Sequence, residues 1–574
     1  MELIHDDPGV TRICAAAYTL ETVANRPFVL LKDGQGSQVA ELFALSDVST
    51  SGGREDHTSW GLWQVNPAAD GALELCLTAG SSLWQHKTVR FLCWEDHIRY
   101  EIEVTGRGSI EEIHYFGGHF SGITRWGSGF FWSGQSFRQG FSPEPNSAER
   151  LYFAPSSGAS VDLLGVPVPG RADWFFTPPP FCFALQSASG WIGAGIAAVP
   201  GQNQYTALHY RGRDGAFYLS LDCEGHLPVD GRAVLPALTI DFADDEYAAL
   251  ARHAEGLRAA GLAPRVPAGP RPDWWQGPIF CGWGAQCALA ARAKGRAPNY
   301  SRQENYERFL ANLSAHGLQP PAVVIDDKWQ LHYGSNQADP QKWPDLPGFI
   351  AARHAAGQKV LLWLKAWDPE GLPAEECITN AGGLPLAFDP TAPAFRARLV
   401  ASVQTMLSDA KGYGADGFKL DFSARIPSGP GLRHHGPEWG LELMRAYLDL
   451  LYRAAKAAKP DALVIAHTPH PYLADVVDML RLNDVNTGSD VVVQMRHRAR
   501  VARLACPGSL IDTDNWPMVD RATWRAYLPV QPQLGVPALY FDESVDATGE
   551  PLEEADYALL RAIWAERAWV QEPK

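Results

Sequence analysis

The stretch Ala322-Val-Val-Ile-Asp-Asp-Lys-Trp329 joins a four-residue apolar run to two carboxylates and a tryptophan. Short apolar runs of this kind recur through the second half of the chain, with helix-like segments such as Tyr306–His316, Pro347–Ala356, Pro393–Lys411 and Leu441–Lys459 between them. Such an alternation is typical of parallel strands that are covered by helices on the outside. Eight units in about 300 residues predict one (β/α)8 TIM barrel. The eight runs are Pro278–Trp283, Ala322–Ile325, Lys359–Leu364, Gly417–Leu420, Leu463–Ala466, Met479–Leu482, Ser509–Ile511 and Pro537–Phe541.

The first half of the chain has a different pattern. Runs such as His97–Val104 alternate apolar and polar residues, and turn residues such as Lys32-Asp-Gly34 separate them. This pattern is typical of an antiparallel β-sandwich or β-barrel. A helical stretch, Asp244–Ala260, then leads into a proline-rich segment. We therefore predict two parts, a β-sandwich domain with a helical linker over residues 1–260 and a catalytic barrel over residues 271–574.

Composition excludes several classes of partner. The net charge is −16, with 49 Lys+Arg against 65 Asp+Glu, and nucleic-acid binding needs a basic face. No run approaches the ~18 apolar residues of a membrane span, so no membrane partner is expected. The acidic N-terminus has no apolar signal-peptide core, and the nine cysteines form no CxxC pair, which together predict a cytoplasmic protein without a disulfide framework. Whether the chain forms a homo-oligomer is left open.

Polar and aromatic residues follow nearly every predicted barrel strand, at the end where such barrels carry their chemistry. Carboxylates accept hydrogen bonds from sugar hydroxyls, and tryptophan faces stack on sugar rings. Strand ends are polar in any case, and each tryptophan has core packing as its alternative. This chemistry needs no metal or cofactor, although His467 and His470 are spaced as an alternative metal pair. The tryptophans within or just after strands are Trp283, Trp329, Trp363, Trp367 and Trp516.

Two motifs stand out among these strand ends. In Asp416-Gly-Phe-Lys-Leu-Asp-Phe422, strand alternation places Lys419 and Asp421 on one face. A nearby ammonium favours the ionised carboxylate that a nucleophile requires, whereas a plain ion pair at the barrel rim is the structural alternative. The second motif, Arg481-Leu-Asn-Asp484, follows two strands later. An acid/base at Asp484 needs a raised pKa.

Together with Ile325-Asp-Asp-Lys-Trp-Gln330, these motifs resemble the retaining α-glycosidase clan of glycoside hydrolase families 27, 31 and 36, and most closely the α-galactosidases (melibiases) of family 36. Phe388-Asp-Pro390 resembles a further clan feature, and Asp421-Phe-Ser-Ala-Arg425-Ile-Pro427 is similar to the family 31 signature as well. The resemblance implies an N-terminal β-supersandwich before the barrel. It implies Asp421 as nucleophile and Asp484 as acid/base, with Asp512 or Asp514 as the alternative acid. The substrate-binding residues that we expect are Asp326, Asp327, Trp329, Trp283, Trp363, Lys365, Trp367, Lys419, His467, Arg481, Asp512, Asp514 and Trp516.

The expected function is that of a retaining exo-α-glycosidase, with an α-galactoside as the first choice of substrate. Other specificities within the clan (α-glucoside, α-xyloside, sulfoquinovoside) remain alternatives, as does a transglycosylase that uses a sugar in place of water. A sugar-binding protein without catalysis is the alternative from another class. In every case the expected partner is an oligosaccharide or glycoside.

Overall fold

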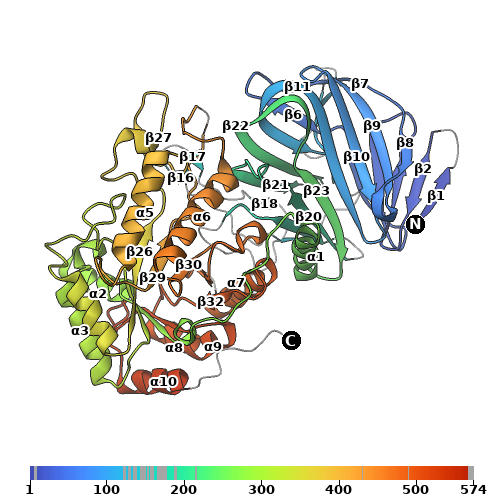
Figure 1. The fold of residues 1–574 in the computed structure, drawn as a ribbon. Coiled ribbons are helices and arrows are strands. Elements are labelled where there is room, and N and C mark those ends of the chain that lie inside the picture. Colours follow the sequence, from blue (N-terminus) through green and yellow to red (C-terminus); the bar gives the residue numbers. More distant parts are fainter. Residues whose placement is uncertain are drawn as a thin grey trace.

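The computed structural model describes residues 1–5, 9–120, 124–126, 131–132, 139–141, 150–151, 154–155, 161–163, 178–186, 190–213, 216–429, 431–488 and 490–565. The end of the predicted barrel domain, residues 566–574, lies outside these residues. Figure 1 shows two parts side by side, a β-sheet domain built from the first half of the chain and a barrel built from the second half. Both parts of the predicted fold are confirmed.

The N-terminal domain contains two large β-sheets, whose pairs are almost all antiparallel. Side chains in its long strands alternate between buried and partly exposed, as in β10 and β11, because one face of the sheet packs on the core. The six-stranded sheet has the order β1-β2-β3-β4-β5-β14: Glu2–His5, Thr11–Cys14, Tyr18–Thr22, Phe28–Asp33, Gln38–Phe43 and Phe131–Trp132. The longest path of the second sheet is β13-β12-β7-β9-β10-β11-β23-β20-β19-β15: Thr124–Trp126, Gly118–Phe120, His57–Trp60, Leu73–Ser81, His86–Cys93, His97–Tyr115, Ala237–Ala243, Trp191–Ala197, Cys182–Gln186 and Gln139–Phe141.

Further strands extend the second sheet, and one of them, β22, reaches the barrel domain. Strand β22 (Ala216–Val234) pairs with β11 and with β21 (Ala207–Arg213). The remaining strands of this domain are β6 (Asp47–Thr50), β8 (Gln64–Pro67), β18 (Val161–Leu163) and the hairpin β16–β17 (Arg150–Leu151, Ala154–Pro155).

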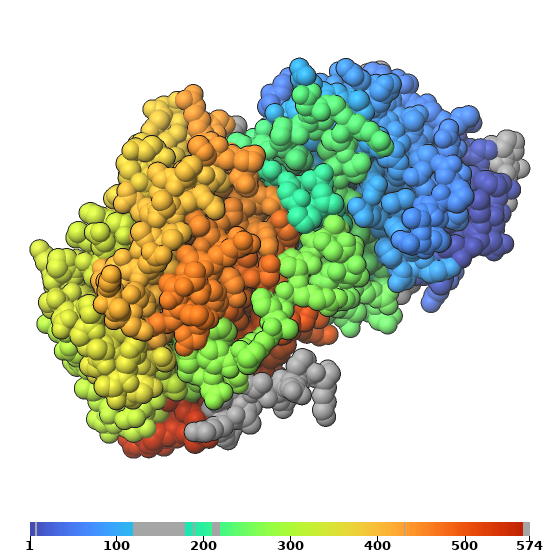
Figure 2. Space-filling model, viewed as in Figure 1, coloured from blue at the N-terminus to red at the C-terminus, as the bar shows by residue number. Residues whose placement is uncertain are grey.

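Helix α1 (Glu246–Ala259) is the predicted helical linker, and it is packed into the domain junction. The carboxylate of Asp245 caps its first turn by accepting from the backbone N–H groups of Tyr247 and Ala248. Its buried face lies on the β19–β20–β23 part of the sheet and against helix α7 of the barrel. The hydroxyl of Tyr247 lies 3.0 Å from Nδ1 of His497 on α7. The junction is therefore an ordered contact between the two parts (Figures 1 and 2).

The barrel has eight parallel strands in the order in which they occur in the chain. Strand β33 pairs with β24, and a bridge from Asp512 to Val536 closes the ring. The strands are buried along their length, as the apolar runs predicted. They are β24 (Ile279–Cys281), β25 (Ala322–Ile325), β26 (Lys359–Lys365), β29 (Gly417–Asp421), β30 (Leu463–Ala466), β31 (Met479–Arg481), β32 (Leu510–Asp512) and β33 (Ala538–Leu539).

Helices cover the outside of the barrel. A small hairpin, β27–β28 (Cys377–Thr379, Pro385–Phe388), lies between β26 and α5 (Pro393–Leu407). Within residues 467–478 the connection from β30 to β31 is a short 3-10 turn, Pro471–Leu473. The first predicted strand is shorter than expected, because helix α2 already begins at Trp283. The helices are α2 (Trp283–Ala293), α3 (Gln303–Ala315), α4 (Leu346–Ala355), α5 (Pro393–Leu407), α6 (Gly440–Ala458), α7 (Val491–Ala505), α8 (Arg521–Tyr527), α9 (Gln531–Leu534) and α10 (Glu554–Ala565).

No helix among the described residues combines the length and the apolar character needed to cross a bilayer. The nine cysteines are all free.

Candidate active site

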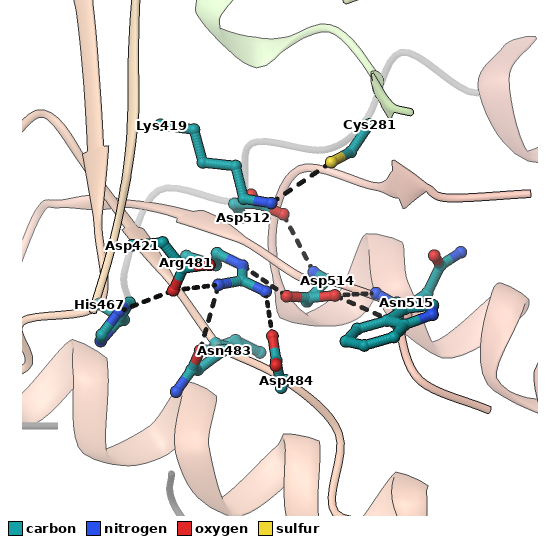
Figure 3. Close-up of polar contacts among 12 residues, drawn as sticks. Cys281, Lys419, Asp421, His467, Arg481, Asn483, Asp484, Asp512, Asp514 and Asn515 are labelled. Carbon is teal, nitrogen blue, oxygen red and sulfur yellow. Dashed lines mark hydrogen bonds and ion pairs between the residues drawn. The ribbon is translucent and has the colours of Figure 1, made fainter. Parts of the chain in front are cut away.

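The buried guanidinium of Arg481 lies at the centre of a group of carboxylates at the carboxyl ends of the barrel strands (Figure 3). Its Nη1 is 3.6 Å from Oδ1 of Asp421, its Nη2 contacts Asp484, and its Nε is 2.6 Å from Oδ2 of Asp514. Nη1 also donates to the side-chain oxygen of Asn483 at 3.1 Å. One cation thus connects the predicted nucleophile, the predicted acid/base and a third carboxylate.

Asp421, the last residue of β29, is held as an anion. Its oxygens accept from the indole N–H of Trp363 at 3.2 Å and the backbone N–H of Phe422 at 2.9 Å, and Nε2 of His467 lies 3.4 Å away. Burial alone would raise the pKa of this carboxyl, but the contact with His467 and the charge of Arg481 lower it below its usual value. The side chain keeps 15% of its surface exposed. An ionised, partly accessible carboxylate is what a nucleophile requires.

Asp484 differs from Asp421 in the direction of its pKa shift. Burial, together with the negative charges of Asp421 and Asp514, raises the pKa of Asp484 to about 6, although Arg481 opposes the rise. Its side chain is 26% exposed. Arg498, fully buried on α7, donates to the backbone carbonyls of residues 482, 483 and 484 at 2.7–3.1 Å. That contact fixes the turn that carries Asp484.

Lys419 makes its ion pair with Asp326. Its ammonium donates to Oδ2 of Asp326 at 2.7 Å and to the sulfur of Cys281 at 3.3 Å. As expected, its positive charge is among the causes that lower the pKa of Asp421, after His467 and Arg481. The alternative interpretation, a Lys419–Asp421 ion pair, does not match these contacts, because Asp326, which follows β25 two strands away, receives the ammonium.

Asp327 lies on the more open side of the same strand end. Its Oδ1 accepts from the hydroxyl of Tyr333 at 2.7 Å, and burial raises its pKa to about 6. The ring of Tyr333 lies 4.5 Å from Nζ of Lys365 and 5.9 Å from the ring of Trp363. Nζ of Lys365 is also 2.7 Å from Asp368. Tyr333 and Phe422 are partly exposed aromatics on this rim.

Asp512, the last residue of β32, and Asp514, in the loop that follows, are both buried. Asp514 is fully enclosed, contacts Arg481 and accepts from the backbone N–H groups of Asn515 and Trp516 at 2.6 and 3.0 Å. Asp512 accepts from the backbone N–H of Asp514 at 3.0 Å, and burial raises its pKa to about 6. Asp514 thus orients Arg481, and Asp512 in turn holds the backbone of Asp514.

The five candidate tryptophans have three kinds of environment. Trp283 and Trp516 are partly exposed and meet edge to face at 5.7 Å. Trp363 is buried but touches Asp421. Trp329 is 0% exposed and donates to the carbonyl of Trp363, and Trp367 is 4% exposed and donates to the carbonyl of Ser423. The expectation that Trp329 and Trp367 face the sugar is therefore wrong in this structure, because both belong to the core.

The two histidines do not form a metal pair. His467 faces Asp421, whereas Nδ1 of His470 accepts from the backbone N–H of Tyr472. Among the described residues, one group has the geometry of metal ligands, namely Asp47, Glu55 and His57 in the N-terminal domain. The ammonium of Lys87 lies 2.6 Å from Glu55 and 3.0 Å from His57, so the side chain of a lysine already contacts that group.

The site includes residues that the sequence did not single out. Cys281 lies 3.0 Å from Asp326, Tyr333 binds Asp327, and the ring of Tyr540 is 5.1 Å from the ammonium of Lys419. Cys281 and Tyr540 lie at the ends of the first and eighth barrel strands, where a search of strand ends for all polar residues finds them. Tyr333 lies in a loop and has no comparable sequence pattern.

Five residues within three positions of the ends of barrel strands have a left-handed backbone although none is glycine: Lys328, Trp367, Phe422, Asn483 and Asp514, with φ between 46° and 69°. Each such residue costs about 1 kcal/mol or more, and residues of this kind concentrate at functional sites. Their sharp turns direct the neighbouring side chains across the open end of the barrel.

A β-domain followed by a barrel with carboxylates and aromatic residues at its strand ends defines a fold shared with known α-glycosidases. A sulfoquinovosidase of glycoside hydrolase family 31 from E. rectale, in complex with an aza-sugar inhibitor, is 12% identical with a TM-score of 0.57, over 99% of this chain and 85% of that one. An α-galactosidase from Thermus thermophilus, in complex with stachyose, is 14% identical with a TM-score of 0.51, over 88% and 99%. No protein-family model and no curated protein sequence matches the chain.

Proposed function

We propose that this protein is a retaining exo-α-glycosidase in which Asp421 is the nucleophile and Asp484 the acid/base. One observation supports this most directly: two carboxylates share the guanidinium of Arg481 while their pKa values are shifted in opposite directions. A pair of neighbouring carboxyls with separated pKa values provides a base or nucleophile and an acid at the same pH.

The reaction follows from these protonation states. Ionised Asp421 attacks the anomeric carbon, and protonated Asp484 gives its proton to the departing oxygen, which leaves as an alcohol. Asp484, now a carboxylate, removes a proton from water, and the resulting hydroxide displaces Asp421 from the β-linked intermediate. The sugar is released with its original α configuration. Lys419 donates to Asp326 at 2.7 Å and so orients this carboxylate as an acceptor for sugar hydroxyls.

Asp484 is preferred over Asp512 and Asp514 as the acid/base because of accessibility. The side chain of Asp484 is 26% exposed, whereas Asp512 and Asp514 are 3% and 0% exposed. Asp514 also spends both oxygens on Arg481 and the backbone. An acid/base has to contact the leaving oxygen and then a water molecule. A carboxylate that is enclosed by protein cannot make these contacts.

The sequence motifs favour an α-galactoside as the substrate. A panel of aryl α-glycosides that includes the galactoside, glucoside, xyloside and sulfoquinovoside tests this, with added acceptor sugar to detect transglycosylation. Hydrolysis of the galactoside above the others is the expected result. Hydrolysis of another member alone would change the substrate and keep the mechanism.

Azide rescue tests the two roles separately. In Asp421→Ala, azide takes the place of the missing nucleophile, and the expected product is the β-glycosyl azide. In Asp484→Ala, azide attacks the glycosyl-enzyme formed from an activated aryl glycoside, and the expected product is the α-glycosyl azide. Products of the reversed configuration, or normal turnover in either variant, would contradict the assignment. Wild-type protein that turns over no member of the panel would contradict the proposed function itself.

A further inference from the structure

Strand β22 of the N-terminal domain bulges toward the barrel. Along its pairing with β11, Leu227 faces Ile110 and Asp222 faces Glu112, so the four residues 223–226 of β22 lie opposite the single residue Glu111. Glu224 and Gly225 both have positive φ, of 50° and 79°. A bulge re-aims side chains away from the ladder, and a left-handed Glu is held at a cost in free energy. The contacts of the bulge therefore have to compensate for this cost in free energy.

The bulge meets the loop that joins β29 to α6. The Oε2 atom of Glu224 accepts from the backbone N–H of Gly429 at 2.8 Å and from the indole N–H of Trp439 at 3.2 Å. The ring of His226 stacks on Trp439 with centroids 3.8 Å apart and an angle of 20°. One carboxylate thus holds both halves of this loop. Figure 2 shows that green atoms of the N-terminal domain and orange atoms of the barrel domain touch along the junction.

The other end of this loop begins at the predicted nucleophile. The backbone N–H of Phe422 donates to Oδ1 of Asp421, and the backbone N–H of Arg425 donates to the carbonyl of Phe422 at 2.9 Å. The guanidinium of Arg425 lies 4.5 Å above the ring of Phe422. From Phe422 to Gly429 the described chain is short, and Glu224 fixes its far end.

We infer that Glu224, on the N-terminal domain, is a positioning residue that holds the β29–α6 loop so that Phe422 keeps its hydrogen bond to Asp421. This inference rests on the proposed function. It assigns the β-domain a part in the chemistry of the barrel, without contact between Glu224 and the reacting atoms.

Glu442 offers a matched control at the same interface. It also accepts backbone N–H groups from the other domain, those of Gly201 at 2.7 Å and Asn203 at 3.0 Å. It lies in the first turn of α6, beyond the loop. Loss of either carboxylate weakens the junction, but only loss of Glu224 releases the loop beside Asp421.

The experiment compares Glu224→Leu, Glu224→Gln and Glu442→Ala with the wild type. We expect Glu224→Leu to lower kcat roughly 10–100-fold with KM nearly unchanged, since small displacements of a reacting group have effects of this size. Glu224→Gln should recover most of kcat because its amide oxygen accepts the same two hydrogen bonds. Glu442→Ala should lower the thermal unfolding midpoint and leave kcat within about twofold. If Glu224→Leu does not fold, Glu224→Asp, whose shorter side chain does not reach both donors, replaces it.

Hydrogen exchange gives a second readout that does not depend on turnover. The amides of residues 422–429 should exchange faster in the Glu224 variant than in Glu442→Ala. Unchanged exchange at Phe422, an unchanged kcat, or an equal loss of kcat in Glu442→Ala would overturn the inference. If the wild type hydrolyses no α-glycoside, the proposed function fails, and the exchange result alone decides whether Glu224 orders the loop.

Discussion

Strand β29 has an aspartate at each end, and the two are held in different ways. Asp416, just before the strand, lies among three cationic or ionisable groups: His354 at 2.7 Å, Lys359 at 3.2 Å and Lys459 at 3.3 Å. Asp421, its last residue, lies among carboxylates, with Arg481 and Lys419 as the nearby buried cations. Burial opposes ionisation at both positions, yet the pKa of each is lowered by its neighbours.

A lowered pKa therefore does not identify the nucleophile by itself. The distinguishing feature is the excess of negative charge at the carboxyl end of the barrel. There, Asp327, Asp484 and Asp512 all have a pKa raised to about 6, with burial as the first cause. At the amino end, Asp416 is surrounded by His354, Lys359 and Lys459, and it connects strands and helices through these contacts. The site is distinguished by one carboxyl whose pKa is lowered beside others whose pKa values are raised.

Exchanging the two aspartates for asparagine gives the largest expected contrast. Asp421→Asn should lower kcat by about 10⁴-fold, since it removes the group that forms the covalent bond. Asp416→Asn should leave kcat of the folded protein within about threefold. Steady-state kinetics on an aryl α-glycoside measures both. Comparable losses in the two variants would erase the distinction between the ends of the strand.

Asp416 should matter for stability. Asp416→Asn should lower the free energy of unfolding by about 2 kcal/mol at neutral pH, because it leaves charged and backbone groups without their acceptor. The folded-state pKa of Asp416 is lowered, so its contribution is complete above the unfolded pKa of about 3.9 and disappears as the pH falls below it. Urea unfolding at pH 7 and pH 3 should show a difference between variant and wild type that shrinks at the lower pH.

The pH dependence of kcat/KM reports the carboxylates at the active end. Activity should fall above about pH 6 as Asp484 loses its proton, and should fall at low pH only where Asp421 becomes protonated, below the usual range of an aspartate. Asp514→Asn removes a negative charge that helps to raise the pKa of Asp484. The alkaline limb should therefore move to lower pH in that variant. A limb that stays in place would contradict Asp484 as the acid.

The tryptophans provide the smallest contrast. Trp516→Ala should raise KM roughly threefold to tenfold by removing an exposed stacking surface. Trp329→Phe should leave KM unchanged and lower stability, because the indole N–H that donates to the carbonyl of Trp363 is lost. Kinetics combined with thermal unfolding separates the two effects. An increase of KM in Trp329→Phe would return that residue to the sugar site.

The sequence predicted the barrel strands well because they are buried on both faces, as in β25, where Ala322–Ile325 matches residue for residue. It misjudged Trp329 and Trp367 because a residue after a strand end can turn either way. Trp367 has a φ of 64°, and its indole turns into the core against Phe388. Spacing along one strand does not specify the distance to the next strand.

The same limit applies to the ion-pair partner of Lys419. Alternation along β29 places Lys419 and Asp421 on one face, but the ammonium pairs with Asp326 of another strand. The contact of Tyr333 with Asp327 and the pKa of Asp484 depend on burial and on side chains from several loops. These properties arise only when the barrel closes.

The left-handed residues at the carboxyl ends of the strands have counterparts at the amino ends, and those are glycines: Gly317, Gly357, Gly414 and Gly508, with φ between 72° and 91°. Glycine adopts this conformation without the steric penalty of a side chain. The two rims therefore differ in where substitutions can increase stability. The amino rim is already relaxed, and the stability still to be gained lies at positions such as Lys328, where glycine would relieve the backbone but remove a side chain beside the site.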